Sequence, residues 1–432
     1  MKRALIQSII LAVTILSVPP LALAQQGSGF LIERIEIRGN DKTHSDVIIR
    51  SLELREGERL TPDGISRSRA ALQRTRLFRT VHVASKPGSE QGTAIIMVYV
   101  QEKRFGDVGV SVEYTELDGF GLSADAYHVN LGGQGRVLGA EYGLGERFRY
   151  WGLSYSHPWL SGSDVSLHAR VRGSVADRDL YREKIPSARG SYDLERVGAA
   201  FGLGRQLGMD HQVIFSYSFE EVDVGGVRPP GIPAGGTPYS DEVVATQGTS
   251  PTALFTIDVR NRADTEPWGS RPGYELDARA DFSTDFIGST GDYVRLQASL
   301  YGHFQTIPHQ LVTLGFRSGI IAGDPPFYER FYLDDQHQLR GIERRSIAPE
   351  GGERLLSAEA LYSVSLSELG RGYLFAETAG IWRTTGGQTI RRRGGTVGIG
   401  ILLLNRVDIS FGFGTGVLII KSHRFGGINV GL

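Results

Sequence analysis

Hydrophobic and polar residues alternate along most of this chain, in stretches of about ten residues that run from residue 105 to the end. In the clearest stretch, Val294, Leu296 and Phe304 lie on one face, and Arg295 and His303 lie on the other. A period of two is typical of a β-strand with one apolar face and one polar face. The pattern predicts sixteen strands, near residues 105–114, 120–130, 135–144, 148–157, 164–175, 190–204, 211–223, 252–260, 272–284, 293–306, 309–322, 354–366, 371–382, 396–404, 406–414 and 423–432.

The connections between these strands are alternately short and long. Short turns are expected at residues 131–134, 160–163, 307–308 and 405, and long loops at residues 176–189, 223–251, 323–353 and 383–395. Bacterial outer-membrane barrels show this alternation, with short periplasmic turns and longer external loops. Because backbone polar groups in a bilayer must be paired within the protein, such strands have to close on themselves. The prediction is a mainly β fold, with a 16-stranded transmembrane antiparallel β-barrel over residues 104–432 in the cell outer membrane.

Residues 25–103 follow a different pattern and are expected to form a small periplasmic domain. A strand over residues 31–38 ends at the turn pair Gly39-Asn40, and helical spacing follows over residues 44–54. A second helix opens at Thr61-Pro62, where proline is tolerated in the first turn. Two more strands are expected at residues 78–85 and 94–101. The predicted order is therefore β-α-α-β-β.

The first 24 residues have the pattern of a secretory signal peptide. Lys2 and Arg3 precede an apolar run over residues 4–18, and Ala22-Leu23-Ala24 precedes Gln25. Cleavage is expected after Ala24. The alternative is a transmembrane anchor, but the apolar run is short for a span and is followed by two prolines.

Composition excludes some classes of function and leaves others open. The 432 residues are 22% charged with a formal net charge of -1, which gives none of the basic excess expected of a nucleic-acid-binding protein. Cysteine is absent, so disulfides and cysteine-ligated metals are excluded. The 57 glycines and 17 tyrosines suit a barrel with many turns and interfacial aromatic rings. No catalytic motif is present, so we expect no enzyme and no cofactor.

Short motifs in both parts of the chain resemble one known family. Residues 35–40 (IEIRGN) and 76–83 (RLFRTVHV) resemble a POTRA domain, the periplasmic module of the BamA/TamA family of outer-membrane assembly barrels. Residues 130–135 (NLGGQG), 155–160 (YSHPWL) and 267–271 (PWGSR) resemble turns of the barrel in that family. The alternative for residues 25–103 is a small α+β module with no known partner.

The most specific resemblance lies in the long loop predicted at residues 323–353. The run FYLDD at residues 331–335 leads to Leu339, Arg340, Gly341 and Ile342, which resembles the loop tip that this family folds back into the barrel lumen. The resemblance implies that Glu377, on the thirteenth predicted strand, is the acidic partner of Arg340. Arginine suits this place because its planar guanidinium pairs bidentately with carboxylates and stays charged, so lysine should substitute poorly.

The last predicted strand contains the three glycines Gly426, Gly427 and Gly431. Glycine weakens a strand because it loses more entropy on folding and packs no side chain. These glycines are interpreted as a weak lateral seam between the sixteenth strand and the first. The alternative is that they only relieve crowding inside the barrel.

The resemblance implies an outer-membrane protein assembly, insertion or translocation factor. Its POTRA domain would receive unfolded outer-membrane or secreted client proteins by strand addition, and its seam would template or pass them. Outer-membrane lipid, periplasmic chaperones and accessory lipoproteins are the other expected partners, and nucleic acid is not. The alternatives are a porin-like diffusion channel and a dedicated exporter of one secreted partner, whose known relatives usually carry two POTRA domains.

Overall fold

The structure is a computed structural model of the full chain. It describes residues 29–115, 119–160, 163–182, 185–207, 211–228, 243, 246–262, 272–333, 339–340, 347–348, 350–367, 370–385, 387–403, 407–412 and 418–422. The signal peptide predicted at residues 1–24 lies outside the described residues. No described helix has the length and hydropathy needed to cross a membrane.

The N-terminal domain has the β-α-α-β-β order that the sequence predicts. Its elements are β1 (Leu31–Arg38), α2 (Ser45–Ser51), α3 (Pro62–Arg74), β2 (Phe78–Pro87) and β3 (Thr93–Glu102). The three strands form one sheet in the order β1-β3-β2, with β1 parallel and β2 antiparallel to β3. The Thr61 side chain caps α3 by accepting a hydrogen bond from the Gly64 amide at 3.0 Å.

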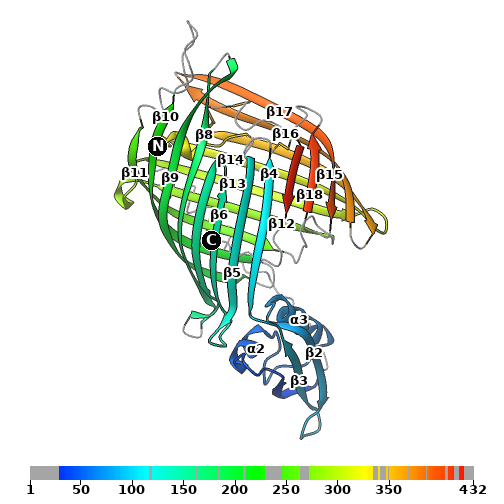
Figure 1. Ribbon diagram of the computed structural model, residues 1–432. Coiled ribbons are helices and arrows are strands. Elements are labelled where there is room, and N and C mark those ends of the chain that lie inside the picture. The colour runs from blue at the N-terminus through cyan, green and yellow to red at the C-terminus, as the bar shows by residue number, and fades with distance from the viewer. Residues whose placement is uncertain are drawn as a thin grey trace.

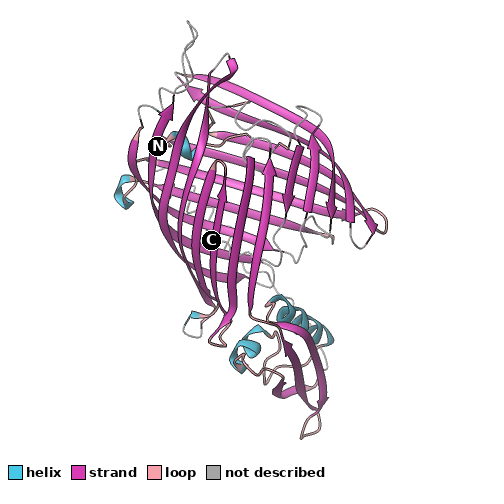
Figure 2. Ribbon diagram, viewed as in Figure 1, coloured by secondary structure: helices cyan, strands magenta, loops and turns pink. Residues whose placement is uncertain are grey.

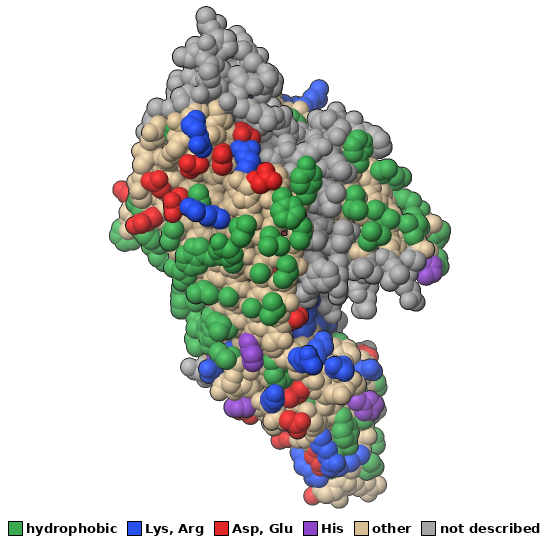
Figure 3. Space-filling view, in the orientation of Figure 1, with side chains coloured by type: hydrophobic (Ala, Val, Ile, Leu, Met, Phe, Trp, Pro, Cys, Tyr) green, Lys and Arg blue, Asp and Glu red, His purple; other side chains and the backbone are tan. Residues whose placement is uncertain are grey.

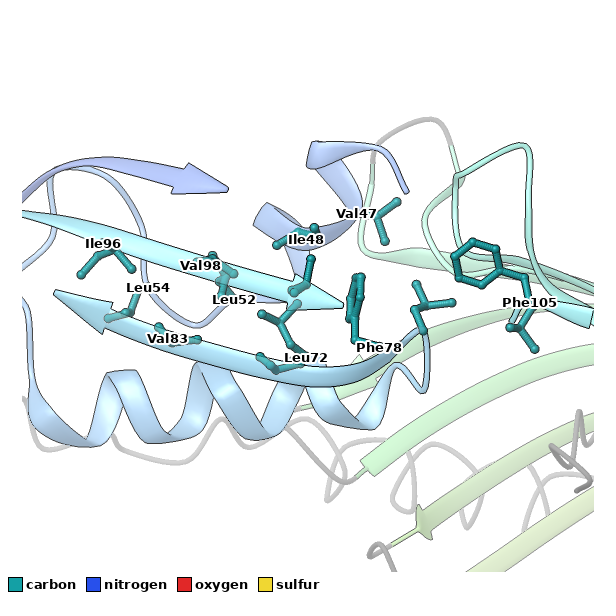
Figure 4. Packing of buried hydrophobic residues seen from close by; sticks show 14 of the residues in the cluster. Val47, Ile48, Leu52, Leu54, Leu72, Phe78, Val83, Ile96, Val98 and Phe105 are labelled. Atoms are coloured by element: carbon teal, nitrogen blue, oxygen red, sulfur yellow. The ribbon is translucent and has the colours of Figure 1, made fainter. Parts of the chain in front are cut away.

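A single apolar core holds the two helices on the sheet. Ile48 of α2, Leu72 of α3 and Ile96 and Val98 of β3 are fully buried and lie between the helices and the strands (Figure 4). The same cluster continues into the barrel through Phe105. The N-terminal domain and the end of the barrel therefore share hydrophobic contacts.

The rest of the described chain forms one closed barrel of sixteen strands, β4 to β19, each hydrogen-bonded to the next, with β19 returning to β4 (Figure 1). Figure 2 shows that the barrel is almost entirely strand and that the N-terminal domain lies at one end of it. The strands are β4 (Gly106–Thr115), β5 (Gly119–Leu131), β6 (Arg136–Gly145), β7 (Phe148–His157), β8 (Val165–Arg182), β9 (Ile185–Leu207), β10 (His211–Arg228), β11 (Gly248–Arg262), β12 (Gly273–Ser283), β13 (Tyr293–Gln305), β14 (Gln310–Gly323), β15 (Arg354–Ser367), β16 (Gly370–Thr385), β17 (Gln388–Leu403), β18 (Val407–Gly412) and β19 (Leu418–Ser422).

Alternation along the strands separates an apolar outer surface from a polar interior. On β13, Leu296, Leu300 and Phe304 are exposed on the outside, whereas Arg295 and His303 are largely buried inside. Figure 3 shows hydrophobic side chains covering the outer wall of the barrel. This arrangement suits a barrel with lipid outside and a polar lumen.

Two of the loops predicted from the sequence are strands instead. β8 and β9 run through residues 176–189, apart from 183–184, and β16 and β17 run through most of residues 383–395. The prediction was wrong because these ends carry many charged residues, which hide the alternation while the backbone ladder continues. Arg147 stabilises one such extension by pairing with Asp177 at 3.1 Å and with Asp179 at 2.7 Å.

The closing strand also differs from the prediction. The barrel closes through β19 at Leu418–Ser422, a segment that the sequence pattern assigned to a loop. The pattern was misleading because residues 416–420 (GVLII) form a continuous apolar run without alternation. The strand predicted at residues 423–432, with Gly426, Gly427 and Gly431, lies outside the described residues.

Candidate functional site in the barrel lumen

A loop between β14 and β15 folds back into the lumen and places Arg340 against the barrel wall. The Arg340 guanidinium pairs with Glu377 of β16 at 3.0 Å and with Glu359 of β15 at 2.8 Å. The Arg340 backbone amide also donates a hydrogen bond to Glu377 at 2.6 Å. Glu377 therefore holds both the side chain and the main chain of the loop tip. Gly341 and Ile342 lie outside the described residues.

The two carboxylates that receive Arg340 are neighbours across the sheet. Glu359 and Glu377 are register partners on β15 and β16, and the Glu377 side chain has no exposed surface. Like charges directly opposite each other destabilise a sheet. A guanidinium placed between them relieves that repulsion, so the wall and the loop tip stabilise each other.

Aromatic and apolar contacts also hold the loop tip against the barrel wall. The Arg340 guanidinium lies 4.9 Å from the ring centre of Phe375 and 5.6 Å from that of Tyr373. Both distances are within the range of a cation–π interaction. Leu339 is buried, and a Cβ atom on Gly394 of β17 would lie 3.2 Å from its side chain and 2.2 Å from that of Ile347. Glycine at residue 394 thus leaves room for the loop.

A second cluster, which the sequence analysis did not identify, fixes the start of the same loop. Glu329, in the short helix η3 (Phe327–Glu329), pairs with Arg196 of β9 and Arg295 of β13, each at 2.8 Å. Arg295 also pairs with Asp281 of β12 at 2.8 Å. We name Arg196, Arg295, Glu329 and Asp281 the Glu329 clamp. It connects the start of the loop to β9, β12 and β13, whereas Arg340 contacts β15 and β16.

Apolar packing supports the Glu329 clamp. Phe327 contacts Tyr192 edge to face, with ring centres 5.7 Å apart, in a buried cluster that includes Val222 and Val224 of β10. Backbone hydrogen bonds of 3.0 and 2.9 Å between Phe331 and Gly352 join the start of the loop to its end. The clamp could have been suspected from the sequence, because Arg196 and Arg295 are cations at lumen-facing positions of otherwise alternating strands.

The barrel closes at the seam between β4 and β19. Three register pairs join them, Ile419 with Thr115, Ile420 with Tyr114 and Lys421 with Glu113. These are pairs among the described residues alone, because residues 413–417 and 423–432, on either side of β19, lie outside the described part of the chain.

The described residues contain no cluster of three or more histidine, aspartate or glutamate side chains that could hold a metal ion. The charged groups in the lumen are instead paired with each other, as in the contacts of Arg340 and of the Glu329 clamp. The arrangement is therefore suited to holding a loop in place.

Comparison with known families and proteins supports the resemblance found in the sequence. A family model described as the Omp85 superfamily domain matches residues 130–423. A second, the POTRA model described as surface antigen variable number repeat, matches residues 30–103. The two matches cover both parts of the chain.

Curated relatives are distant in sequence. The outer membrane protein assembly factor BamA of Nitratidesulfovibrio vulgaris is 22% identical over 333 residues, which are 75% of this chain and 39% of that protein. The protein of the same name from Neisseria meningitidis serogroup B is 23% identical over 384 residues, 83% of this chain and 47% of that protein. The chain thus spans less than half the length of these relatives.

Solved structures share the fold. BamA from Haemophilus ducreyi lacking POTRA domains 1-3 matches with a TM-score of 0.62 and 17% identity, over 91% of this chain and 83% of that one. CdiB from Escherichia coli matches with a TM-score of 0.63 and 12% identity, over 92% of this chain and 77% of that one. At these identities the likeness is evidence for the fold alone.

Proposed function

We propose, from the premise that this chain belongs to the Omp85 superfamily, that it assembles outer-membrane proteins or translocates secreted ones. The barrel lies in the outer membrane and its POTRA domain lies in the periplasm. The proposed clients are unfolded polypeptides that reach the barrel from the periplasm.

The observation that carries this proposal is the loop held inside the barrel by two separate clusters. Arg340 is seated on β15 and β16, and Glu329 is held by β9 and β13. Burying these charges is costly unless they are paired, so the paired network keeps the loop in the lumen and obstructs an open passage there. A loop held in this way favours a regulated passage over a porin-like channel.

The seam where β19 returns to β4 is the place where we propose that a client leaves the barrel, because it joins the first and the last described strands of the barrel. Opening this seam frees one edge of β4. A client strand could then pair with the freed edge of β4. We propose this lateral route as the mechanism of insertion.

The POTRA domain supplies a first place for a client to pair. In the sheet order β1-β3-β2, strand β2 has one neighbour and one free edge. An extended peptide can add to such an edge through backbone hydrogen bonds, with little dependence on its sequence. The proposed role of β2 is therefore to receive unfolded segments.

Depletion of the protein, followed by a quantitative census of outer-membrane and secreted proteins, tests this function. General loss of β-barrel proteins would indicate a broad assembly factor, and loss of one secreted species would indicate a dedicated exporter. An unchanged census would contradict both versions of the proposal. A porin-like channel instead predicts slower uptake of small solutes with a normal census.

A further inference from the structure

A cavity of about 470 Å³ lies where the POTRA domain meets the barrel. Its lining includes Lys42 from the POTRA domain, Arg104 from the segment that leads into β4, and His128 near the end of β5. Leu131 and the glycine turn at residues 132–133 form the opposite side. No acidic side chain is among the described residues that line it.

Two of the residues that line the cavity, Gly106 and His128, occupy outward-facing positions of the barrel strands. Even-numbered residues of β4 and β5 point outward, as shown by Val108, which is 68% exposed, and Leu122, which is 40% exposed. Gly106 and His128 are register partners and share this parity. They come one step before the apolar wall begins, so the cavity lies at the periplasmic edge of the membrane.

The basic side chains at this edge are free of side-chain ion pairs within the described residues. Lys42 and Arg104 are exposed and form no ion pair there. The nearby Glu102 carboxylate accepts hydrogen bonds from the backbone amides of Lys42 and Thr43. Asp107 has the opposite parity and accepts a hydrogen bond from the Tyr127 hydroxyl at 3.0 Å. Figure 3 shows basic side chains gathered at the level where the two domains meet, below the apolar wall.

The walls of the cavity are fixed by hydrogen bonds between the domains. Asn130 donates to the Thr43 hydroxyl at 2.9 Å, and the His44 amide donates to the Gly133 carbonyl at 2.9 Å. Gly133 has φ +72°, and a Cβ atom there would lie 2.3 Å from the Lys42 carbonyl. The backbone of Lys42 is therefore held directly against the barrel turn.

We propose that this cavity binds the phosphate-bearing headgroup of an anionic phospholipid from the periplasmic leaflet. Two cations and an imidazole would face the phosphate, and the acyl chains would extend over Val108, Val110 and Leu122 on the outer wall. The cavity lies beside β4, one of the two seam strands, so a bound lipid would also hold the POTRA domain next to the seam. This inference depends on the membrane placement of the barrel and not on the identity of its clients.

Native mass spectrometry of the full-length protein in detergent, titrated with phosphatidylglycerol, tests the proposal. The variant Lys42→Gln/Arg104→Gln should bind about thirtyfold more weakly, because each basic side chain near a lipid surface contributes about 1 kcal/mol. The matched control is Arg59→Gln/Arg69→Gln, which removes two cations of the POTRA domain that do not line the cavity. Its phosphatidylglycerol binding should equal that of the wild type.

Other ligands define the results that would overturn the proposal. Phosphatidylcholine, which has no net charge, should bind the wild type and Lys42→Gln/Arg104→Gln equally weakly. Equal retention of phosphatidylglycerol by the two double variants would contradict a site at this cavity. Displacement of phosphatidylglycerol by an equal concentration of inorganic phosphate would assign the cavity to a free anion. A heat-dependent shift in gel mobility confirms that each variant is a folded barrel.

Discussion

At the scale of single residues, the described loop tip depends on one cation between two carboxylates. Arg340 contacts Glu359 and Glu377, which face each other across β15 and β16. Removing one member of a buried pair leaves an uncompensated charge, which typically costs about 3–5 kcal/mol. The roles of these residues can therefore be tested one substitution at a time.

Replacing Arg340 by alanine should abolish client assembly while the barrel stays folded. The loop tip loses its contacts with Glu359 and Glu377, but the backbone hydrogen bonds between strands do not involve the Arg340 side chain. Complementation of a depleted strain measures function, and the heat-dependent gel shift measures folding. Arg340→Lys should restore little activity, because an ammonium group cannot span both carboxylates as the planar guanidinium does.

A second substitution separates charge repulsion from function. Arg340→Ala/Glu377→Gln should recover part of the thermal stability lost in Arg340→Ala, because one of the two facing carboxylates is then neutral. The double variant should still fail to complement the depleted strain, because the loop tip still lacks the Arg340 side chain that holds it against β15 and β16. Full activity of Arg340→Ala alone would refute the role assigned to this arginine.

Neutralising Glu329 should loosen the start of the loop. Glu329→Gln removes the carboxylate that Arg196 and Arg295 share, although Arg196 keeps Glu220 and Arg295 keeps Asp281. We expect larger and longer conductance openings in planar bilayers than for the wild type. The control Glu221→Gln changes an exposed carboxylate of β10 and should leave conductance unaltered. Identical traces for the two variants would show that the clamp does not hold the loop.

At the scale of elements, the sequence predicts best where a strand crosses the apolar layer. The strands β6 and β13 lie within about a residue of their predicted positions, because lipid on one side and water on the other impose strict alternation. The requirement for alternation ends where the strands leave the apolar layer of the membrane. The parts of β8, β9, β16 and β17 beyond that layer were therefore predicted as loops. β19 was missed because its apolar run has no alternation.

The candidate site, like the strands, was predicted only in part. Arg340 and Glu377 were selected because a motif resembled that of a known family, and the structure places them in contact. The Glu329 clamp was not found, because its members lie on β9, β12, β13 and η3 and no local pattern in the sequence joins them. The cavity between the POTRA domain and the barrel was missed for a similar reason, since its walls come from two domains.

The turn between β5 and β6 is the element that docks the POTRA domain. Asn130 is buried, donates to Thr43, and accepts a hydrogen bond from the Gly135 amide at 2.7 Å. Asn130→Ala leaves buried partners unsatisfied, at a cost of about 1–3 kcal/mol each. We expect faster proteolysis between the domains with an intact barrel. Gln101→Ala, an exposed change on β3, should be cut at the wild-type rate.

At the scale of the whole molecule, the structure is a closed barrel, and we propose that it opens at the seam between β4 and β19. The loop is held by two clusters on different strands, and the POTRA domain is docked beside β4, the first seam strand. The POTRA domain thus lies next to one strand of the seam, whereas the two loop clusters lie on other strands of the barrel. Client passage should therefore depend on separating β4 from β19.

A disulfide across the seam tests this claim most directly. The chain has no cysteine, so Tyr114→Cys/Ile420→Cys, at register partners of β4 and β19, introduces a unique pair. Leu300→Cys/Phe316→Cys is the control, at register partners of β13 and β14. The account predicts that oxidation stops client assembly in the seam variant, that a reductant restores it, and that the control works in both states. Undiminished assembly with the seam fully crosslinked would contradict the account.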